Sequence, residues 1–126
     1  HLMFPHMTVG QNVGFGLPKG VAHRRDVIAA ALDDIGLAGF ADRDPATLSG
    51  GQRARAALMR MLLADPAALL LDEPFSRLDA GLRDRVRGLV FERARSARLP
   101  VVLVTHDRAD AMAAGGKLIT LSPPQP

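Results

Sequence analysis

Two adjacent carboxylates follow an apolar run in the second half of the chain. Residues 67–71 are apolar, Asp72 and Glu73 come directly after them, and Pro74 ends the segment. In open parallel sheets, ligands bind beyond the carboxyl ends of the strands. Asp72 is therefore placed to hold Mg²⁺ through water, and Glu73 to polarise an attacking water. The plainer alternative, that both acids only solvate a strand end, is equally supported by this motif alone.

A second motif lies before a predicted helix. Leu48 is followed by Ser49, Gly50, Gly51 and Gln52. Serine is a good helix N-cap, and the two glycines allow backbone N–H groups to approach an anion. The partial positive charge of a helix N-terminus would favour that anion. Taken alone, however, this motif is better explained as an ordinary capped helix after a Ser-Gly-Gly turn.

The elements that must position these residues follow from hydrophobic periodicity. We expect residues 1–20 to be a loop or a partly extended segment, because glycine and proline interrupt it. Apolar spacing predicts helices over 23–36, 49–64, 80–97 and 107–114, and strands over 67–71, 101–104 and 117–121. The strands read as buried on both faces, and helices alternate with them. The second half therefore predicts an α/β fold with a parallel sheet.

Composition narrows the class of protein. The chain has 126 residues, 48% of them hydrophobic, which suits one domain with one core. We expect no membrane helix, because no apolar run approaches the length of about 18 residues that a span needs. Cysteine is absent, so thiolate chemistry is excluded. The net charge of +3 comes from scattered arginines and the chain has no Trp or Tyr, so no nucleic-acid partner is expected.

The order of four segments resembles the ATP-binding-cassette (ABC) family. Residues 48–52 look like its signature motif, 72–74 its Walker B motif, 76–79 its D-loop, and 101–107 its switch strand with a histidine. The segment from Phe4 to Val9 is similar to the one that follows the Q-loop in importer ATPases. The resemblance covers essentially the whole chain.

The resemblance implies a partial P-loop NTPase (ABC ATPase) fold. It would combine a helical subdomain with the last parallel strands of the RecA-like core. Residues 1–66 would form the segment after the Q-loop and the helical signature subdomain. Residues 67–126 would form the C-terminal part of the ATPase core, with the Walker B motif, the D-loop and the switch histidine.

The resemblance also implies roles for residues at the strand ends. Asp72 would bind Mg²⁺ through water. Glu73 would be the general base for water that attacks the γ-phosphate of ATP. His106 would contact the γ-phosphate and help to hold the attacking geometry. The reaction would be phosphoryl transfer to water, driven mainly by positioning and charge stabilisation.

A second set of implied roles concerns a dimer. Ser49, Gly50 and Gly51 would bind the γ-phosphate of ATP held by a second ATPase subunit, and Gln52 would support that contact. Asp79 would lie at the subunit boundary and help to couple the two sites.

One family motif is absent from the sequence. The phosphate-cradling loop, or Walker A motif, is G-x-x-x-x-G-K-[ST], and the only Gly-Lys pair, Gly116-Lys117, lacks the other residues. Both that loop and the Q-loop glutamine are expected before His1, because Gln11 is on the wrong side of the segment after the Q-loop. We therefore expect a C-terminal fragment that does not hydrolyse ATP by itself.

The function that follows is the ATPase subunit of a bacterial importer for a small solute. It would be cytoplasmic and peripheral on the inner face of the cell membrane. Transmembrane permease subunits would dock near residues 4–9, where Phe4, Met7 and Val9 look exposed, although core packing of these residues is the alternative. Other interpretations are a soluble ABC ATPase that acts on nucleic acid or ribosomes, and a non-catalytic interaction fragment.

Overall fold

A computed structural model describes residues 3–125 of the chain. The helices are α1 (Val9–Val13), α2 (Arg24–Asp34), α3 (Gly50–Leu63), α4 (Ala80–Ser96) and α5 (Arg108–Ala114), with a 3₁₀ turn η1 (Pro45–Thr47). The strands are β1 (Leu69–Asp72) and β2 (Val101–Val104). They are parallel, with Leu69 opposite Val101 and Asp72 opposite Val104. The predicted α/β class is confirmed.

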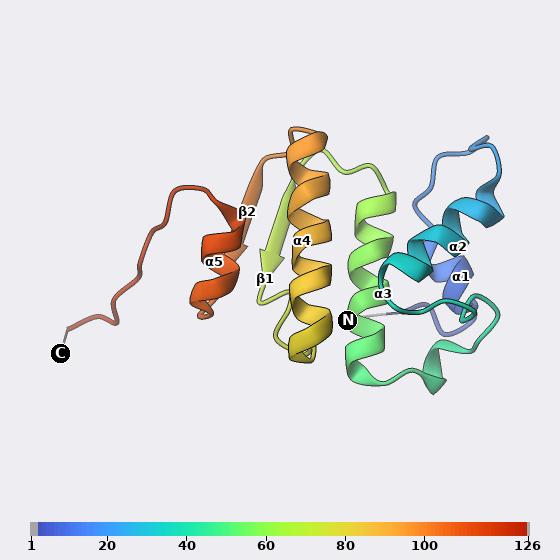
Figure 1. The fold of residues 1–126 in the computed structure, drawn as a ribbon, viewed down its shortest axis with the longest axis horizontal. Helices are drawn as coiled ribbons and strands as arrows, with labels where there is room; N and C mark the ends of the chain where they lie inside the picture. Colours follow the sequence, from blue (N-terminus) through green and yellow to red (C-terminus); the bar gives the residue numbers. More distant parts are fainter. Residues whose placement is uncertain (1–2, 126) are drawn as a thin grey trace.

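The elements are arranged as a row along the long axis of the molecule (Figure 1). Helices α1 and α2 pack against α3, α3 contacts α4, and α4 contacts α5. The two strands lie on the side of α4 and α5, away from α1 and α2. The helical first half and the strand-containing second half therefore meet where α3 contacts α4.

One hydrophobic core runs through both halves. Leu69 and Leu71 of β1 are buried in the same cluster as Val86 and Val90 of α4. The ring of Phe75 packs edge-on against that of Phe91, with 5.8 Å between centroids. Burial of each large apolar side chain contributes about 1.5–3 kcal/mol. This packing holds the carboxyl end of β1 in a fixed position.

Side-chain caps set where the helices begin. The Thr8 side chain accepts from the backbone of Gln11 at α1, and the Gln11 side chain returns a bond to Thr8, which makes a capping box. Asp79 caps α4 and Asp107 caps α5 in the simpler one-bond manner. These caps satisfy backbone N–H groups that have no partner inside the helix.

Helix α1 was not predicted, because residues 1–20 read as a loop. The helix is too short to show apolar periodicity, and glycines surround it. The structure stabilises it with the capping box and with Asn12, a buried residue whose side chain bonds both the N–H and the carbonyl of Phe4.

Two predictions about the sheet are wrong. Residues 117–121 form no strand, and Leu118, Ile119 and Leu121 are exposed. Within residues 3–125 this segment has no ladder partner, and a strand exists only when a neighbouring strand pairs with it. The strands are also buried on one face only: Leu70 is 78% exposed and Val102 58% exposed. Helices cover a single face of this two-stranded sheet.

Among the described residues, no helix is long and apolar enough to cross a membrane.

Candidate functional site

Glu73 occupies an unusual backbone position directly after β1. Its φ is 45°, in the left-handed region that residues other than glycine rarely adopt. Its N–H still donates to the carbonyl of Val104, at 2.8 Å, so the pairing of the two strands extends one residue beyond β1. His23, Asp65 and Arg98 adopt the same region, so this conformation alone does not mark Glu73 as functional.

The structure brings Glu73 and His106 together. Glu73 Oε1 lies 2.6 Å from both the backbone N and the ring Nδ1 of His106. Glu73 Oε2 accepts from the Thr105 hydroxyl at 3.3 Å. Both strand ends thus contribute to one cluster at the carboxyl edge of the sheet.

The contact with Glu73 selects a tautomer of His106. An ionised carboxylate can only accept a hydrogen bond, so Nδ1 must carry the hydrogen. In the neutral ring Nε2 is then an acceptor, and the ring is largely exposed to solvent. His106 therefore presents Nε2 outward while Glu73 holds its other nitrogen.

Asp72 ends β1 opposite Val104, and its side chain is exposed. Residues 3–125 hold no group of three or more His, Cys, Asp or Glu side chains that could bind a metal by themselves. A single exposed carboxylate suits Mg²⁺, which usually keeps several waters and is shared between one or two carboxylates and substrate phosphates. Asp72 therefore fits a metal that arrives with a phosphate ligand.

The Ser49–Gln52 segment forms the start of α3. The Ser49 hydroxyl oxygen accepts from the Gln52 backbone at 3.1 Å, and Gln52 Oε1 accepts from the Ser49 backbone at 2.8 Å. Gly50 has open space where a Cβ would lie, whereas a Cβ on Gly51 would come within 3.0 Å of the Arg77 carbonyl oxygen. The capping explanation of this motif is therefore correct as far as local structure goes.

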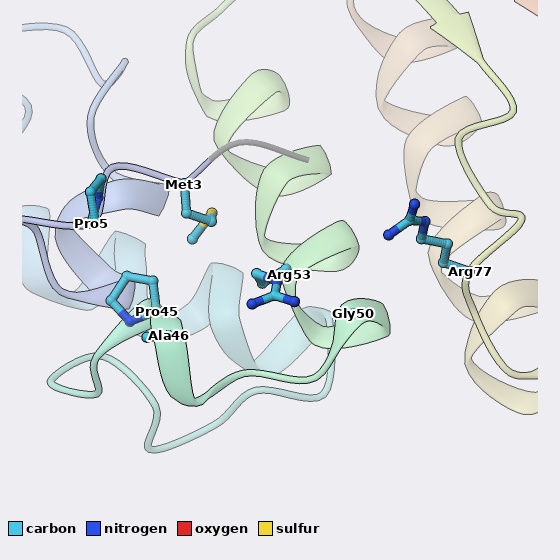
Figure 2. A pocket seen from close by; sticks show the side chains of 7 residues that line it. All are labelled: Met3, Pro5, Pro45, Ala46, Gly50, Arg53 and Arg77. Atoms are coloured by element: carbon cyan, nitrogen blue, oxygen red, sulfur yellow. The ribbon is translucent and has the colours of Figure 1, made fainter.

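A hollow of about 370 Å³ opens beside the same helix start. Figure 2 shows Gly50 and Arg53 from α3 on one side and Arg77, from the segment before α4, on the other. Two guanidinium groups beside a helix N-terminus make this surface electropositive. It is suited to an anion.

Asp79 connects this region to α4. Its side chain accepts from the Leu82 backbone at 3.1 Å. Arg55 of α3 is buried with no hydrogen-bond partner for its Nε. Burial lowers the pKa of Arg55, and the charge of Asp79 partly offsets that effect. The described residues thus place Asp79 within electrostatic range of the helix that begins at Ser49.

Sequence reasoning missed an ionic cluster behind His106. From the sequence, the arginines read only as scattered charges, but Arg83 and Arg87 of α4 both bind Asp110 of α5, which is fully buried. Arg83 also contacts Asp107, at 3.1 Å. A signal existed: the arginines are four residues apart and the aspartates three, so each pair shares a helix face.

The segment at residues 4–9 is only partly exposed. Val9 is fully buried in the core, so the expectation that it lies on an exposed docking loop is wrong. Phe4 and Met7 are half-buried. A wide groove of about 810 Å³ lies beside them, and its lining includes Met7, Gln11 and Phe15. The exposed apolar surface here is that of Phe15, not of Val9.

Comparison with known proteins gives consistent matches. A family model described as ABC transporter matches residues 1–76. The chain is 56% identical over 115 residues to the uncharacterized ABC transporter ATP-binding protein YnjD of Escherichia coli (strain K12), covering 89% of this chain and 52% of that protein. It is 47% identical over 121 residues to the Fe(3+) ions import ATP-binding protein FbpC 3 of Rhodococcus jostii (strain RHA1), covering 95% of this chain and 35% of that protein.

Solved structures agree with the sequence matches. The dimeric ATP-binding cassette MJ0796, in a post-hydrolysis state with ADP and Pi, superposes with a TM-score of 0.75 at 30% identity, covering 88% of this chain and 51% of that one. An inward-facing putative metal-chelate type ABC transporter gives a TM-score of 0.65 at 31% identity, covering 90% of this chain and 48% of that one. The chain therefore spans about a third to a half of the length of the relatives that it matches.

Proposed function

The chain belongs to the ABC transporter family, and we propose that it is part of the ATP-hydrolysing subunit of such a transporter. The observation that carries the proposal is the pairing of Glu73 with His106 at the carboxyl edge of the sheet, beside Asp72. Glu73 and His106 are in contact at the ends of two paired strands, which supports the proposal.

Each residue at the strand ends has a proposed role. Asp72 would hold Mg²⁺ through water. When bound, the metal would neutralise negative charge on the phosphates. Glu73 would accept the proton of the attacking water, because its carboxylate lies at the open edge of the sheet. His106 would contact the γ-phosphate through Nε2, the ring nitrogen that Glu73 leaves free. Phosphate oxygens only accept hydrogen bonds, so this contact would use the imidazolium form, in which both ring nitrogens donate.

The start of α3 has a proposed role in trans. Ser49, Gly50 and Gly51 would bind the γ-phosphate of ATP held by a second subunit, and Gln52 would keep Ser49 in place through the capping box. The Ser49 oxygen accepts from Gln52, which leaves its hydrogen free to donate to an anion. Asp79 would lie at the subunit boundary. A relative of known structure is dimeric, which supports this proposal.

The proposal extends to organisation and location. Residues 1–66 would be the helical signature subdomain, and residues 67–126 the C-terminal part of the ATPase core. The subunit would be cytoplasmic and peripheral on the inner face of the cell membrane. Permease subunits would dock at the groove beside Phe4 and Met7, where Phe15 adds exposed apolar surface. Import of a small solute is supported by relatives named as Fe(3+) import proteins.

The test is Mg²⁺-dependent ATP hydrolysis by the full-length gene product that contains this chain. Glu73→Gln should lower kcat by at least about a hundredfold, because the general base is lost while the shape is kept. Glu92→Gln, at an exposed position on α4, is the matched control and should leave kcat unchanged. Full turnover in folded Glu73→Gln protein would refute the role of Glu73.

The 126-residue chain alone gives a second measurement. We propose that it does not hydrolyse ATP, because it contains no phosphate-cradling loop. Turnover by this chain that disappears in its Glu73→Gln variant would show that another phosphate site exists within these residues.

A further inference from the structure

Helix α5 is attached to the rest of the molecule by ion pairs and by Ala113 and Ala114, which pack against the core. Asp110 is its only fully buried residue. The two carboxylate oxygens of Asp110 are both occupied: Arg87 Nη1 lies 2.9 Å from Oδ1, and Arg83 Nη2 lies 2.5 Å from Oδ2. A helix of this length is not stable alone in water, so its position depends on these contacts with α4 together with the packing of its two alanines against the core.

The arginines also reach the residue that precedes α5. Arg83 Nη2 lies 3.1 Å from Oδ2 of Asp107. The hydrogen bond with Asp110 holds the pKa of Arg83 above its ordinary value, and the charges of Asp110, Asp107 and Glu73 add to the effect. We call Arg83, Arg87, Asp107 and Asp110 the α4–α5 clasp.

The clasp is one residue away from His106. Asp107 follows His106 in the chain, and its backbone N–H donates to the Thr105 hydroxyl at 3.0 Å. The same hydroxyl donates to Glu73 Oε2. The backbone that carries His106 is therefore fixed on one side by Glu73 and on the other by the clasp.

Ion pairs constrain the orientation of a helix more tightly than apolar contacts do. An apolar residue at position 110 would also bury α5, but it would tolerate sliding and rotation of the helix. Planar guanidinium groups match carboxylates at set angles, and two of them on one carboxylate leave it a single arrangement. The clasp thus sets the orientation of α5 as well as its burial.

We propose that the α4–α5 clasp is a positioning device that holds His106 in register with Glu73. This proposal rests on the proposed function, which gives His106 and Glu73 their roles. Arg83, Arg87, Asp107 and Asp110 act as positioning residues, because they act on the reaction through the backbone at His106. Arg83 lies in the first turn of α4, and Asp79 caps that end of the helix. The clasp therefore also links His106 to Asp79 through α4.

The experiment compares Asp110→Asn with Asp84→Asn in the full-length gene product that contains this chain. Asp84 also pairs with Arg87, at 2.7 Å, but it is exposed, so its substitution is the matched control. Asp110→Asn should lower kcat about tenfold with little change in KM for ATP, because a slightly misplaced group costs rate rather than affinity. Asp84→Asn should match the parent.

A second readout needs no nucleotide. The ¹⁵N signals of the His106 imidazole, assigned with His106→Gln, report whether Nδ1 carries the hydrogen that contacts Glu73. In Asp110→Asn these signals should move toward those of a free histidine. A merely structural loss would lower the melting temperature without moving them in the folded protein.

Arg83→Lys keeps the charge but cannot contact both aspartates as a guanidinium does, so it serves where Asp110→Asn does not fold. Unchanged imidazole signals and kcat in folded Asp110→Asn or Arg83→Lys protein would overturn the proposal. If Glu73→Gln keeps its turnover, the proposed role of Glu73 is wrong, but the imidazole signals still decide whether the clasp positions His106.

Discussion

At the scale of single residues, Asp107 has more partners than its neighbours along the chain. One carboxylate oxygen caps α5 by accepting from the Asp110 backbone at 3.0 Å, and the other contacts Arg83. The backbone hydrogen bond from Asp110 holds the pKa of Asp107 below its usual range, and the charges of Arg83 and Arg87 also lower it. The ionised form is therefore the one that the folded state favours.

This shift predicts a pH dependence of stability. An aspartate with a lowered pKa stabilises the fold above its unfolded value of about 3.9, and that contribution disappears as pH falls through the lower folded value. The parent should therefore be more stable than Asp107→Asn near pH 7, and the difference should shrink below about pH 4. Urea unfolding at several pH values measures it. Asp42→Asn, in an exposed loop, is the control; a difference that grows in acid would contradict the argument.

Some site residues could be predicted from sequence and others could not. Asp72, Glu73 and His106 stand directly after apolar runs, and adjacent parallel strands bring their ends together. The partners of Asp110 were missed because two arginines on a surface helix usually point into solvent. Their pairing depends on how α5 lies against α4, which local spacing does not specify.

At the scale of elements, the start of α3 places two glycines in different surroundings. Position 50 is open, whereas a Cβ at position 51 would lie 3.0 Å from the Arg77 carbonyl oxygen. That oxygen belongs to the backbone of the segment between β1 and α4, so it cannot move aside as a side chain can. Close packing of these two segments requires a glycine at position 51 only.

The glycines give a matched pair of substitutions. Gly51→Ala should destabilise the fold by about 1–3 kcal/mol, because the added methyl displaces a neighbouring backbone. Gly50→Ala should be neutral or stabilising by up to about 1 kcal/mol, since alanine favours the helix and meets nothing. Chemical denaturation compares them. Equal losses of stability would show that the approach of Arg77 does not constrain position 51.

The elements themselves were predicted with uneven success. Helices α2 to α5 and both strands lie within a few residues of their expected bounds, because each has clear apolar spacing or a cap. The strand expected at 117–121 failed for a different reason. Its apolar residues fit a strand, but strand formation depends on a neighbour that the local sequence cannot specify.

At the scale of the whole molecule, the sheet is covered on one side. Burial alternates along β1, so Leu69 and Leu71 face the core while Leu70 faces outward. Leu70 and Val102 are exposed next to Val104, which makes a small apolar surface on the open face. The sequence suggested burial on both faces, because an apolar run reports hydrophobicity and not what covers it.

Substitution of the two adjacent leucines by alanine should therefore affect stability very differently. Leu71→Ala should lower the free energy of unfolding by about 2–5 kcal/mol, as large-to-small changes in a core do. Leu70→Ala should change it by less than about 0.5 kcal/mol, in the range of surface substitutions. Thermal or urea unfolding of the chain measures both. Comparable losses at the two positions would mean that the outer face of the sheet is covered in solution.

The turn after β1 has a mechanical consequence. The Glu73 backbone is bonded to Val104, and its carboxylate is bonded to the backbone and ring of His106. With the bond from the Thr105 hydroxyl, four hydrogen bonds join these two segments, so residues 73 and 104–106 should move as one rigid body. The distance between labels at the exposed, paired positions 70 and 102 should stay constant, while labels that span α3 and α4 would report any motion.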